Sequence, residues 1–396
     1  MRTAADDVSM IRRRATVVCV ATLLASALAQ AQVFEYNVQA YAPLPLFAGT
    51  DVQYKWRPRG LLPDNSIVAN VEFFRPEAPG LIDGAAFVLG PQSASAITSP
   101  TGSTLRSLWT TAVETSGRVH LTSEDRNGSL QFYIWQGGVT SEQGNALLAP
   151  SFQVYDASTA GHLLGRSIGA PFGSEVIFNG TRRSITTGTD PFTHESAFSV
   201  NALGDVAGLR SFNTDLVAYV WSPSGNRTLS YPAIDPQWFL RIYTGVEIND
   251  LGWVTAMRSL TDQVTYNSFT YLWRGDERIE LPGGGTDFLT PQLDNLGTLL
   301  SADDTSPYLW RDGELVRMTD LAISGFTGTL LSLDRLEPDG RVIGQALVDG
   351  QRVPVVLTPV PGPGSTALVS IGLLLAARRE RRYRMPETPR FRLSIS

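Results

Sequence analysis

One turn recurs along this chain at an almost constant spacing. In the copy Val200–Val206, an apolar residue is followed by Asn, two further residues, Gly, one more residue and Val. Seven such turns occur, and the residue at the glycine position is Asn65, Gly117, Gly161, Gly204, Gly252, Gly297 or Gly340. The spacings are 52, 44, 43, 48, 45 and 43 residues. A period of this length constrains the fold strongly, because it indicates one supersecondary unit repeated seven times.

The first copy has Asn65 where the others have glycine. Asn is the next most tolerant residue in the left-handed backbone region, so the replacement fits the turn that the glycines predict.

Each repeat continues in a similar way after the turn. A strand follows, then a second strand that ends in an aromatic residue, one further residue and Trp, then a Gly, Asn or Asp turn and a closing strand. The Trp positions are Trp135, Trp221, Trp273 and Trp310. The third unit has Phe178 instead, and the first and seventh lack an aromatic residue there. We interpret the unit as a four-stranded antiparallel meander.

One such sheet cannot bury both faces, so neighbouring sheets must stack. Seven of them in a ring predict an all-β fold, a seven-bladed β-propeller over residues 33–358. The seventh unit ends near Leu357 and lacks a fourth strand, whereas residues 33–42 form an unassigned strand before the first unit. We expect that N-terminal strand to complete the last blade and close the ring, because closure removes exposed sheet edges.

These repeats resemble the HAF-type extracellular repeats, which have an Asn-x-x-Gly-x-Val turn and a later aromatic-x-Trp strand. The resemblance covers most of residues 60–358. It implies an extracellular protein.

The N-terminus has the pattern of a secretory signal peptide. Arg12–Arg14 precede the apolar run Ala15–Ala29, which ends in small residues suited to cleavage after Ala29 or Ala31. We expect residues 1–31 to be this signal and translation to begin at Met10. The single cysteine, Cys19, lies inside it, so the mature protein has no thiol or disulfide.

The C-terminus has a second sorting pattern, predicted over residues 359–384. A Pro/Gly hinge precedes the apolar run Ala367–Ala377, which is shorter than the ~20 residues of a stable spanning helix. Arginines then resist translocation of the far end. The hinge and arginine positions are Val360, Pro361, Gly362, Pro363, Arg378, Arg379, Arg381 and Arg382.

This layout resembles the PEP-CTERM signal that exosortases process in bacteria. Gly362 stands where that family usually has Glu, and residues 385–396, which we expect to be a disordered tail, extend beyond the arginines. The resemblance implies a short apolar C-terminal helix, transient anchoring in the inner membrane and cleavage near the hinge. The alternative is an ordinary C-terminal membrane anchor.

The sequence offers little catalytic chemistry. Asn201, Asn249, Asp294 and Asp339 each supply one or two oxygens, fewer than calcium needs, so we expect them to cap their own turns. The acidic clusters at residues 124–128 and 303–304 fall at predicted hairpin tips, where solvated side chains are expected.

The histidines have no ligand spacing. His120, His162 and His194 are the only three, and His194 falls in a predicted connector before the fourth blade. No Gly-x-Ser-x-Gly elbow occurs, so a hydrolase of that class is not indicated. We therefore predict no catalytic, cofactor or metal residues.

The predicted function is that of an exported, non-enzymatic propeller of the cell surface or biofilm matrix. Its expected partners are signal peptidase, an exosortase and extracellular polysaccharide or protein. A formal net charge of −6 gives no electrostatic reason to expect nucleic acid. The alternative is a secreted carbohydrate-active enzyme whose carboxylates line the central funnel. Two carboxylates that face each other across the axis would favour this alternative.

Overall fold

A computed structural model gives the fold of the central part of the chain. It describes residues 34–43, 53–74, 82–100, 108–124, 129–143, 152–167, 174–185, 194–212, 215–232, 239–261, 266–283, 290–303 and 305–360. The predicted signal peptide, the sorting signal from Pro361 onward and the predicted tail lie outside the described residues.

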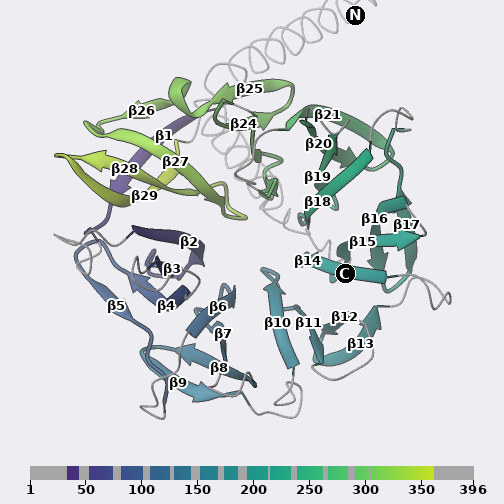
Figure 1. Cartoon of the computed structure of the whole chain (residues 1–396), viewed down its shortest axis with the longest axis horizontal. Coiled ribbons are helices and arrows are strands. Elements are labelled where there is room, and N and C mark those ends of the chain that lie inside the picture. The colour runs from purple at the N-terminus through teal and green to yellow at the C-terminus, as the bar shows by residue number, and fades with distance from the viewer. Residues whose placement is uncertain are drawn as a thin grey trace, which may run out of the picture. The chain divides into compact units, whose positions relative to one another are not determined.

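Seven antiparallel sheets form a ring, which confirms the predicted seven-bladed β-propeller (Figure 1). Six blades have four strands each, in the order of the chain. Blades 1 to 3 comprise β2 (Gln53–Leu61), β3 (Ile67–Phe74), β4 (Ile82–Leu89) and β5 (Ala94–Ala96); β6 (Leu108–Val113), β7 (Val119–Glu124), β8 (Leu130–Gln136) and β9 (Val139–Glu142); and β10 (Phe152–Ala157), β11 (Leu163–Ser167), β12 (Ser174–Phe178) and β13 (Thr181–Ile185). Blades 4 to 6 comprise β14 (His194–Val200), β15 (Val206–Phe212), β16 (Asp215–Ser222) and β17 (Gly225–Leu229); β18 (Phe239–Ile248), β19 (Val254–Thr261), β20 (Tyr266–Arg274) and β21 (Glu277–Gly283); and β22 (Gln292–Leu293), β23 (Leu299–Ala302), β24 (Pro307–Arg311) and β25 (Glu314–Arg317).

Blade 7 is assembled from both ends of the described chain. It comprises β27 (Thr329–Leu336), β28 (Val342–Val348) and β29 (Gln351–Pro359), then the N-terminal β1 (Glu35–Ala40) and the short β26 (Ala322–Ser324). The N–H of Tyr41 donates to the carbonyl of Pro354 at 2.9 Å. The N-terminal strand therefore completes the last blade, as expected. The fifth strand, β26, was not expected from the sequence; it covers the outer edge of β1. A 3-10 turn, η2 (Met318–Asp320), precedes β26.

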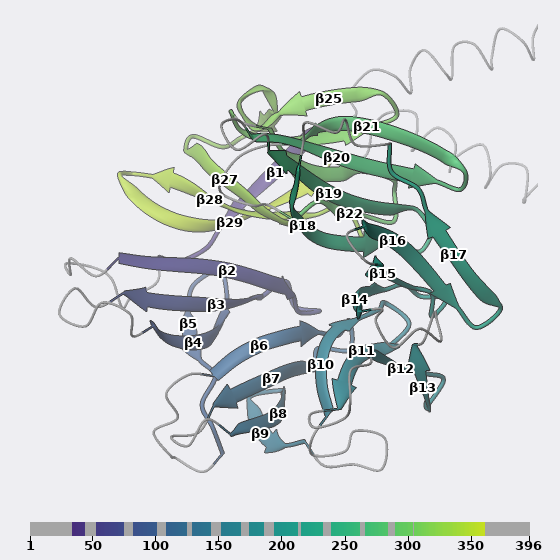
Figure 2. The ribbon, with the colours of Figure 1, turned by 45° about the vertical axis from the view of Figure 1, so that its right-hand side comes forward.

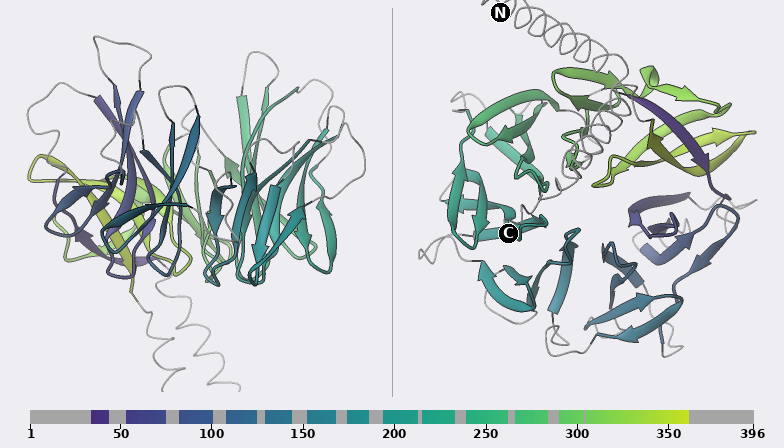
Figure 3. Two further views of the ribbon diagram at one scale, coloured as in Figure 1. Left: turned by 90° about the horizontal axis from the view of Figure 1, so that it is seen from below. Right: turned by 180° about the vertical axis from the view of Figure 1, so that it is seen from behind.

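The first strand of each blade is the innermost strand of the ring. β6, β10, β14 and β18 lie nearest to the centre in Figure 1, and the later strands of a blade follow outward (Figure 2). The view from behind in Figure 3 shows the same radial arrangement. We call these first strands the inner strands.

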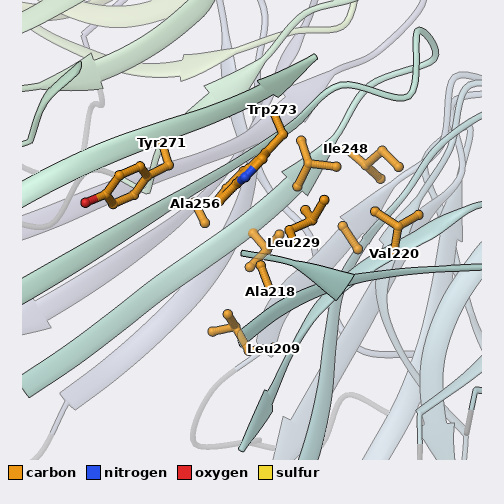
Figure 4. Packing of buried hydrophobic residues seen from close by; sticks show 11 residues of the cluster. Leu209, Ala218, Val220, Leu229, Ile248, Ala256, Tyr271 and Trp273 are labelled. Carbon is orange, nitrogen blue, oxygen red and sulfur yellow. The ribbon is translucent and has the colours of Figure 1, made fainter. Parts of the chain in front are cut away.

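The hydrophobic core consists of layers between neighbouring blades. One layer combines Ala218, Val220 and Leu229 of blade 4 with Tyr271 and Trp273 of blade 5 (Figure 4). The corresponding Trp221 and Trp310 are also buried between blades. Tryptophan thus fills the gap between blades where the repeat predicts it. Truncating such a residue to alanine typically costs about 3–5 kcal/mol.

The repeated turn has the backbone conformation that its sequence predicts. All seven turn residues, Asn65 included, have φ between 66° and 86°. Each turn joins the inner strand of a blade to its second strand, so all seven lie on one face of the ring. We call this the turn face. β29 ends on it, because Leu357 pairs with Val342, two residues after the blade 7 turn.

Candidate functional site

Most inner strands share a β-bulge that the sequence does not predict. In six of them the pairing with the second strand skips one residue, a β-bulge. Five strands have a bulge six residues before the turn residue, for example at Tyr155 and Phe198. In β18 the bulge nearest to the turn, at Gly245, lies seven residues before it, and β18 and β27 each have a second bulge farther from the turn. A bulge re-aims the residues that follow it.

Inner strands have a hydrogen-bonded neighbour on one side only, so N–H groups on the other side need acceptors elsewhere. Side chains of the preceding blade supply them. In blades 3 to 6 the side chain five residues before the turn residue accepts a hydrogen bond. The donor is a backbone N–H in the next blade, four residues before that blade's turn residue. The pairs are Asp156 Oδ2 with Val200 N (2.9 Å), Ser199 Oγ with Ile248 N (3.4 Å), Glu247 Oε2 with Leu293 N (3.0 Å) and Gln292 Oε1 with Leu336 N (2.7 Å). We call these four hydrogen bonds the axial latches.

The remaining part of the ring is joined differently. Arg335 occupies the latch position of blade 7 and cannot accept, so Glu337 takes over: its Oε2 accepts Leu61 N at 3.4 Å and its Oε1 accepts Arg335 Nε at 2.8 Å. Blades 1 and 2 have Gly60 and Ala112 at the latch position, without a polar side chain.

The buried Asn70 joins blades 1 and 2 instead. Its Nδ2 donates to the carbonyl of Thr110 at 2.9 Å, and its Oδ1 accepts Thr110 N at 2.7 Å. One amide therefore satisfies both backbone groups of a residue in the next blade.

Four ionisable groups gather at the centre of the ring: Asp156, Glu247, Arg335 and Glu337, which we call the axial cluster. They come from blades 3, 5 and 7, which are not neighbours, yet Arg335 interacts electrostatically with Asp156, Glu247 and Glu337. Such coupling requires that all four approach the axis. The alternative hypothesis of an enzyme predicts carboxylates in this place.

Burial is the largest influence on the pKa values of the carboxyl groups Asp156 and Glu247 in the axial cluster. It raises the pKa of Glu247 to about 8, against the opposing effects of Arg335 and of the hydrogen bond from Leu293. It also raises the pKa of Asp156, although Val200 N–H and Arg335 favour the ionised form. Burial alone would lower the pKa of Arg335, but Glu337 and Glu247 raise it on balance.

A second set of hydrogen bonds lies at the turns of blades 4 to 6, at the residue three before the turn residue. Asn201 Oδ1 accepts the N–H groups of Leu203 and Asp205, and its Nδ2 donates to the carbonyl of Asn249 in the next blade. Asn249 repeats the pattern, with Nδ2 donating to the carbonyl of Asp294 at 2.8 Å. These residues cap their own turns, as predicted, and also join adjacent blades.

Asp294 keeps the cap but cannot continue this set of hydrogen bonds. Its Oδ1 accepts Leu296 N and Thr298 N, whereas Oδ2 is buried without a hydrogen-bond partner. The matching atom of Asn201 and Asn249 is a donor. Burial raises the pKa of Asp294, which favours a protonated oxygen able to donate.

The remaining predicted acidic and histidine positions are described only in part, because residues 125–128 and residue 304 lie outside the described residues. His120 Nε2 lies 2.7 Å from Glu114 Oε1 inside blade 2, and His162 Nε2 lies 3.1 Å from the carbonyl of Ala202. Asp303 lies at the predicted hairpin tip. Although burial opposes ionisation, hydrogen bonds from Thr305 and its neighbours hold the pKa of Asp303 at about 2. The placement of His194 in a connector was wrong, because it begins β14.

The predicted sorting signal, residues 359–384, is described only at Pro359, the last residue of β29, and at Val360. Val360 N donates to the carbonyl of Glu35 at 2.8 Å. Within the described ranges no group of three or more His, Cys, Asp or Glu side chains has the arrangement of a metal site. Likewise, no helix among the described residues is long and apolar enough to cross a membrane.

The sequence reasoning found the turn residues and missed the latch position. A weak signal for it exists, since the residue five before the turn residue is polar or charged in each of blades 3 to 7. The residue types there are Asp, Ser, Glu, Gln and Arg, so no single-residue motif reveals it.

Comparison with known proteins adds information on the fold alone. No family model matches the sequence, and no curated protein sequence is significantly similar to it. Among solved structures, a prolyl endopeptidase aligns with 79% of this chain at 11% identity and a TM-score of 0.45; this chain spans about half (51%) of its length. An α-L-arabinanase of Penicillium chrysogenum, complexed with arabinobiose, aligns with 82% of this chain and 98% of its own at 14% identity (TM-score 0.37). The polysaccharide lyase Uly1 aligns with 84% of this chain and 93% of its own at 10% identity (TM-score 0.37).

Proposed function

We propose that this protein is an exported, non-catalytic propeller that binds polysaccharide or protein at the cell surface or in the extracellular matrix. The observation that carries the proposal is the engagement of the axial carboxylates. Asp156, Glu247 and Glu337 each accept a backbone N–H of the next blade. Their geometry serves to hold the ring together.

The protonation of the axial cluster supports the same conclusion. A glycoside-cleaving site needs one carboxyl group with a raised pKa and a second that stays ionised. Burial raises the pKa of both Asp156 and Glu247, so burial favours the protonated form of each and does not by itself assign one as the acid and the other as the base.

A carbohydrate-active enzyme is the second candidate, and one observation favours it. The axis holds carboxyl groups from non-adjacent blades, and Glu247, with a pKa of about 8, is protonated at neutral pH as a general acid would be. A screen of polysaccharides for cleavage products compares the protein with its Glu247→Gln variant. Cleavage that this variant abolishes would establish the enzyme and refute the non-catalytic proposal.

Binding is the direct test of the main proposal. The purified protein is titrated against matrix polysaccharide and matrix protein extracted from the producing cells. We expect saturable binding that Glu247→Gln leaves intact, because the glutamine keeps the acceptor for Leu293 N. Consistent absence of binding to both fractions would contradict the proposal.

Export and sorting belong to the same proposal. The N-terminal apolar run supports secretion by signal peptidase, and the hinge, apolar run and arginines support inner-membrane anchoring followed by exosortase processing. A tagged chain is localised with and without the last 36 residues, Pro361–Ser396. We expect the truncated chain to be secreted without a membrane-bound stage; identical fractionation of both chains would refute the sorting role.

A further inference from the structure

Three leucines are exposed at neighbouring tips of the turn face. Leu203, Leu251 and Leu296 each stand directly before the turn glycine, in blades 4, 5 and 6, and are 61%, 54% and 49% exposed. We call them the leucine tips. Isolated exposed leucines need no explanation, but three at one repeat position in adjacent blades form an organised apolar feature.

The same position is not apolar by necessity. The other turns have Asp64, Ser116, Ala160 and Asp339 there. The turn backbone is common to all seven blades, so it tolerates polar residues. The leucines are therefore not required for the turn itself.

Hydrogen bonds hold the turns of blades 4 to 7 together. Ala202 N donates to Asp250 Oδ1 at 2.6 Å, and Asp250 N donates to Asn295 Oδ1 at 2.8 Å. Asn295 N donates to the carbonyl of Pro338 in blade 7 at 2.8 Å. A continuous series of hydrogen bonds therefore connects the turns that carry the leucine tips with the turn of blade 7, the blade from which the chain leaves the ring.

The chain leaves the ring on the turn face. Thr358, near the end of β29, follows the pairing of Leu357 with Val342 beside the blade 7 turn. The apolar run begins nine residues later, at Ala367. An extended chain covers at most about 3.6 Å per residue, so a membrane-inserted run would hold this face within roughly 30 Å of the bilayer.

We propose that the leucine tips dock on the surface of a lipid bilayer while the C-terminal segment anchors the chain, so that the propeller lies with its turn face toward the membrane. This inference rests on the proposed membrane-anchored stage. Tethering raises the effective concentration of the face at the bilayer, so a small apolar contact is sufficient. Leucine side chains enter the boundary between headgroups and acyl chains favourably.

The charges favour a zwitterionic surface. The three turns contain the carboxylates Asp205 and Asp250 and the buried Asp294, and no Lys or Arg between Asn201 and Asp205, Asn249 and Trp253, or Asp294 and Thr298. Anionic lipids would repel these carboxylates. The partner is therefore a phosphatidylcholine-like or phosphatidylethanolamine-like surface.

The test places a polarity-sensitive fluorophore on single cysteines in the full chain, after Cys19→Ser. The labelled variants are Leu251→Cys on a leucine tip, Asp64→Cys at the same turn position in blade 1, and Asp349→Cys in the β28–β29 hairpin on the opposite face. Each is reconstituted with phosphatidylcholine vesicles that contain lipids with a quencher at the headgroup boundary. We expect strong quenching at position 251, less at 64 and none at 349.

Substitution then tests the leucines directly. Leu203→Ser with Leu296→Ser should lower the docking equilibrium constant that quenching at position 251 reports, on the order of fivefold or more for each leucine lost. Leu347→Ser, which removes a 39% exposed leucine in β28, is the matched control and should change nothing. Urea unfolding of each variant checks that the ring is intact.

The outcomes separate this inference from the proposed function. Failure of the chain to float with vesicles would overturn the proposed membrane-anchored stage and this inference together, and would leave the binding proposal to its own titration. Flotation with equal quenching at positions 251 and 349 would overturn the docking of the leucine tips alone. A fluorescence change at position 251 that needs protein concentration and no lipid would assign the tips to a second copy of the chain and overturn the lipid proposal.

Discussion

Blades 3 to 6 and blades 1 and 2 satisfy the free N–H groups of their inner strands in different ways. Bulged inner strands in both regions present N–H groups that need acceptors outside their own sheet. In blades 3 to 6 each acceptor is a side chain at the latch position, and it forms one hydrogen bond to the next blade. Between blades 1 and 2 the acceptor comes from the second strand, where Asn70 forms two bonds to Thr110.

This difference shows that the blades share the need for an acceptor of a backbone N–H, whereas the residue that provides the acceptor varies. Distributed latches tolerate the loss of one member better than a single buried amide does, because each latch supports one bond. The predictions below test that contrast, from the largest expected effect to the smallest.

Asn70→Ala should be the most damaging change. It leaves the N–H and carbonyl of Thr110 buried without partners and opens a cavity, so we expect the free energy of unfolding to fall by about 3–5 kcal/mol. Urea denaturation followed by tryptophan fluorescence measures it. Asn226→Ala, at an exposed hairpin, serves as the control and should shift stability by less than about 0.5 kcal/mol. A loss below about 1 kcal/mol for Asn70→Ala would remove the contrast between the two regions.

Glu247→Ala should cost about 1–3 kcal/mol, because Leu293 N loses its acceptor. Glu247→Gln, which copies the Gln292 latch of blade 6, should preserve the bond. If Gln is as damaging as Ala, the latch interpretation of this residue is wrong.

The two Glu247 variants also differ in their response to pH. Folding raises the pKa of Glu247 from 4.5 to about 8, so the folded state binds the proton more tightly between these values. The free energy of unfolding therefore falls as pH rises from about 4.5 to 8, by an amount on the order of a few kcal/mol. Glu247→Gln should flatten this part of the profile, measured by urea denaturation at a series of pH values. An unchanged slope would contradict the burial of an ionisable group here.

Asp294→Asn should stabilise the protein by about 1 kcal/mol at neutral pH. The new amide would continue the hydrogen bonds between turns as Asn201 and Asn249 do, by donating toward the carbonyl of Glu337. The gain should shrink as pH falls and Asp294 becomes protonated, because its raised pKa lets the acid donate instead. Thermal unfolding at pH 7 and at pH 4 checks both points, and destabilisation at pH 7 would exclude this added hydrogen bond.

Gly252→Ala should have the smallest effect, a loss of about 1 kcal/mol. A Cβ at this position would contact nothing within 4 Å, so the cost arises from φ of 73° alone. Thermal unfolding measures it, and Ser224→Ala in an exposed hairpin is the control. A neutral result would mean that the turn residue is not what fixes the repeat.

Much of the architecture followed from the sequence, and the reason is physical. Left-handed turn residues and large aromatic side chains have few substitutes, so Gly204 and Trp221 recur at readable positions in their repeats. The latch position accepts any side chain with an oxygen, and bulges depend on pairing between strands. Asp156 and Glu247 therefore share a role without sharing a motif, and β26, only three residues long, has too little pattern to predict.

The pairing of β1 with β29 has a consequence for the order of biogenesis. β1 can pair with β29 only after β29 has been synthesised. This contact therefore has nearly the greatest sequence separation in the described chain, and it forms late. A chain that ends before β29 leaves the edge of β1 that pairs with β29 without a partner, and its ring cannot close. The proposed export of an unfolded chain suits this topology, because the ring can close only when β1 and β29 are both available on the same side of the membrane.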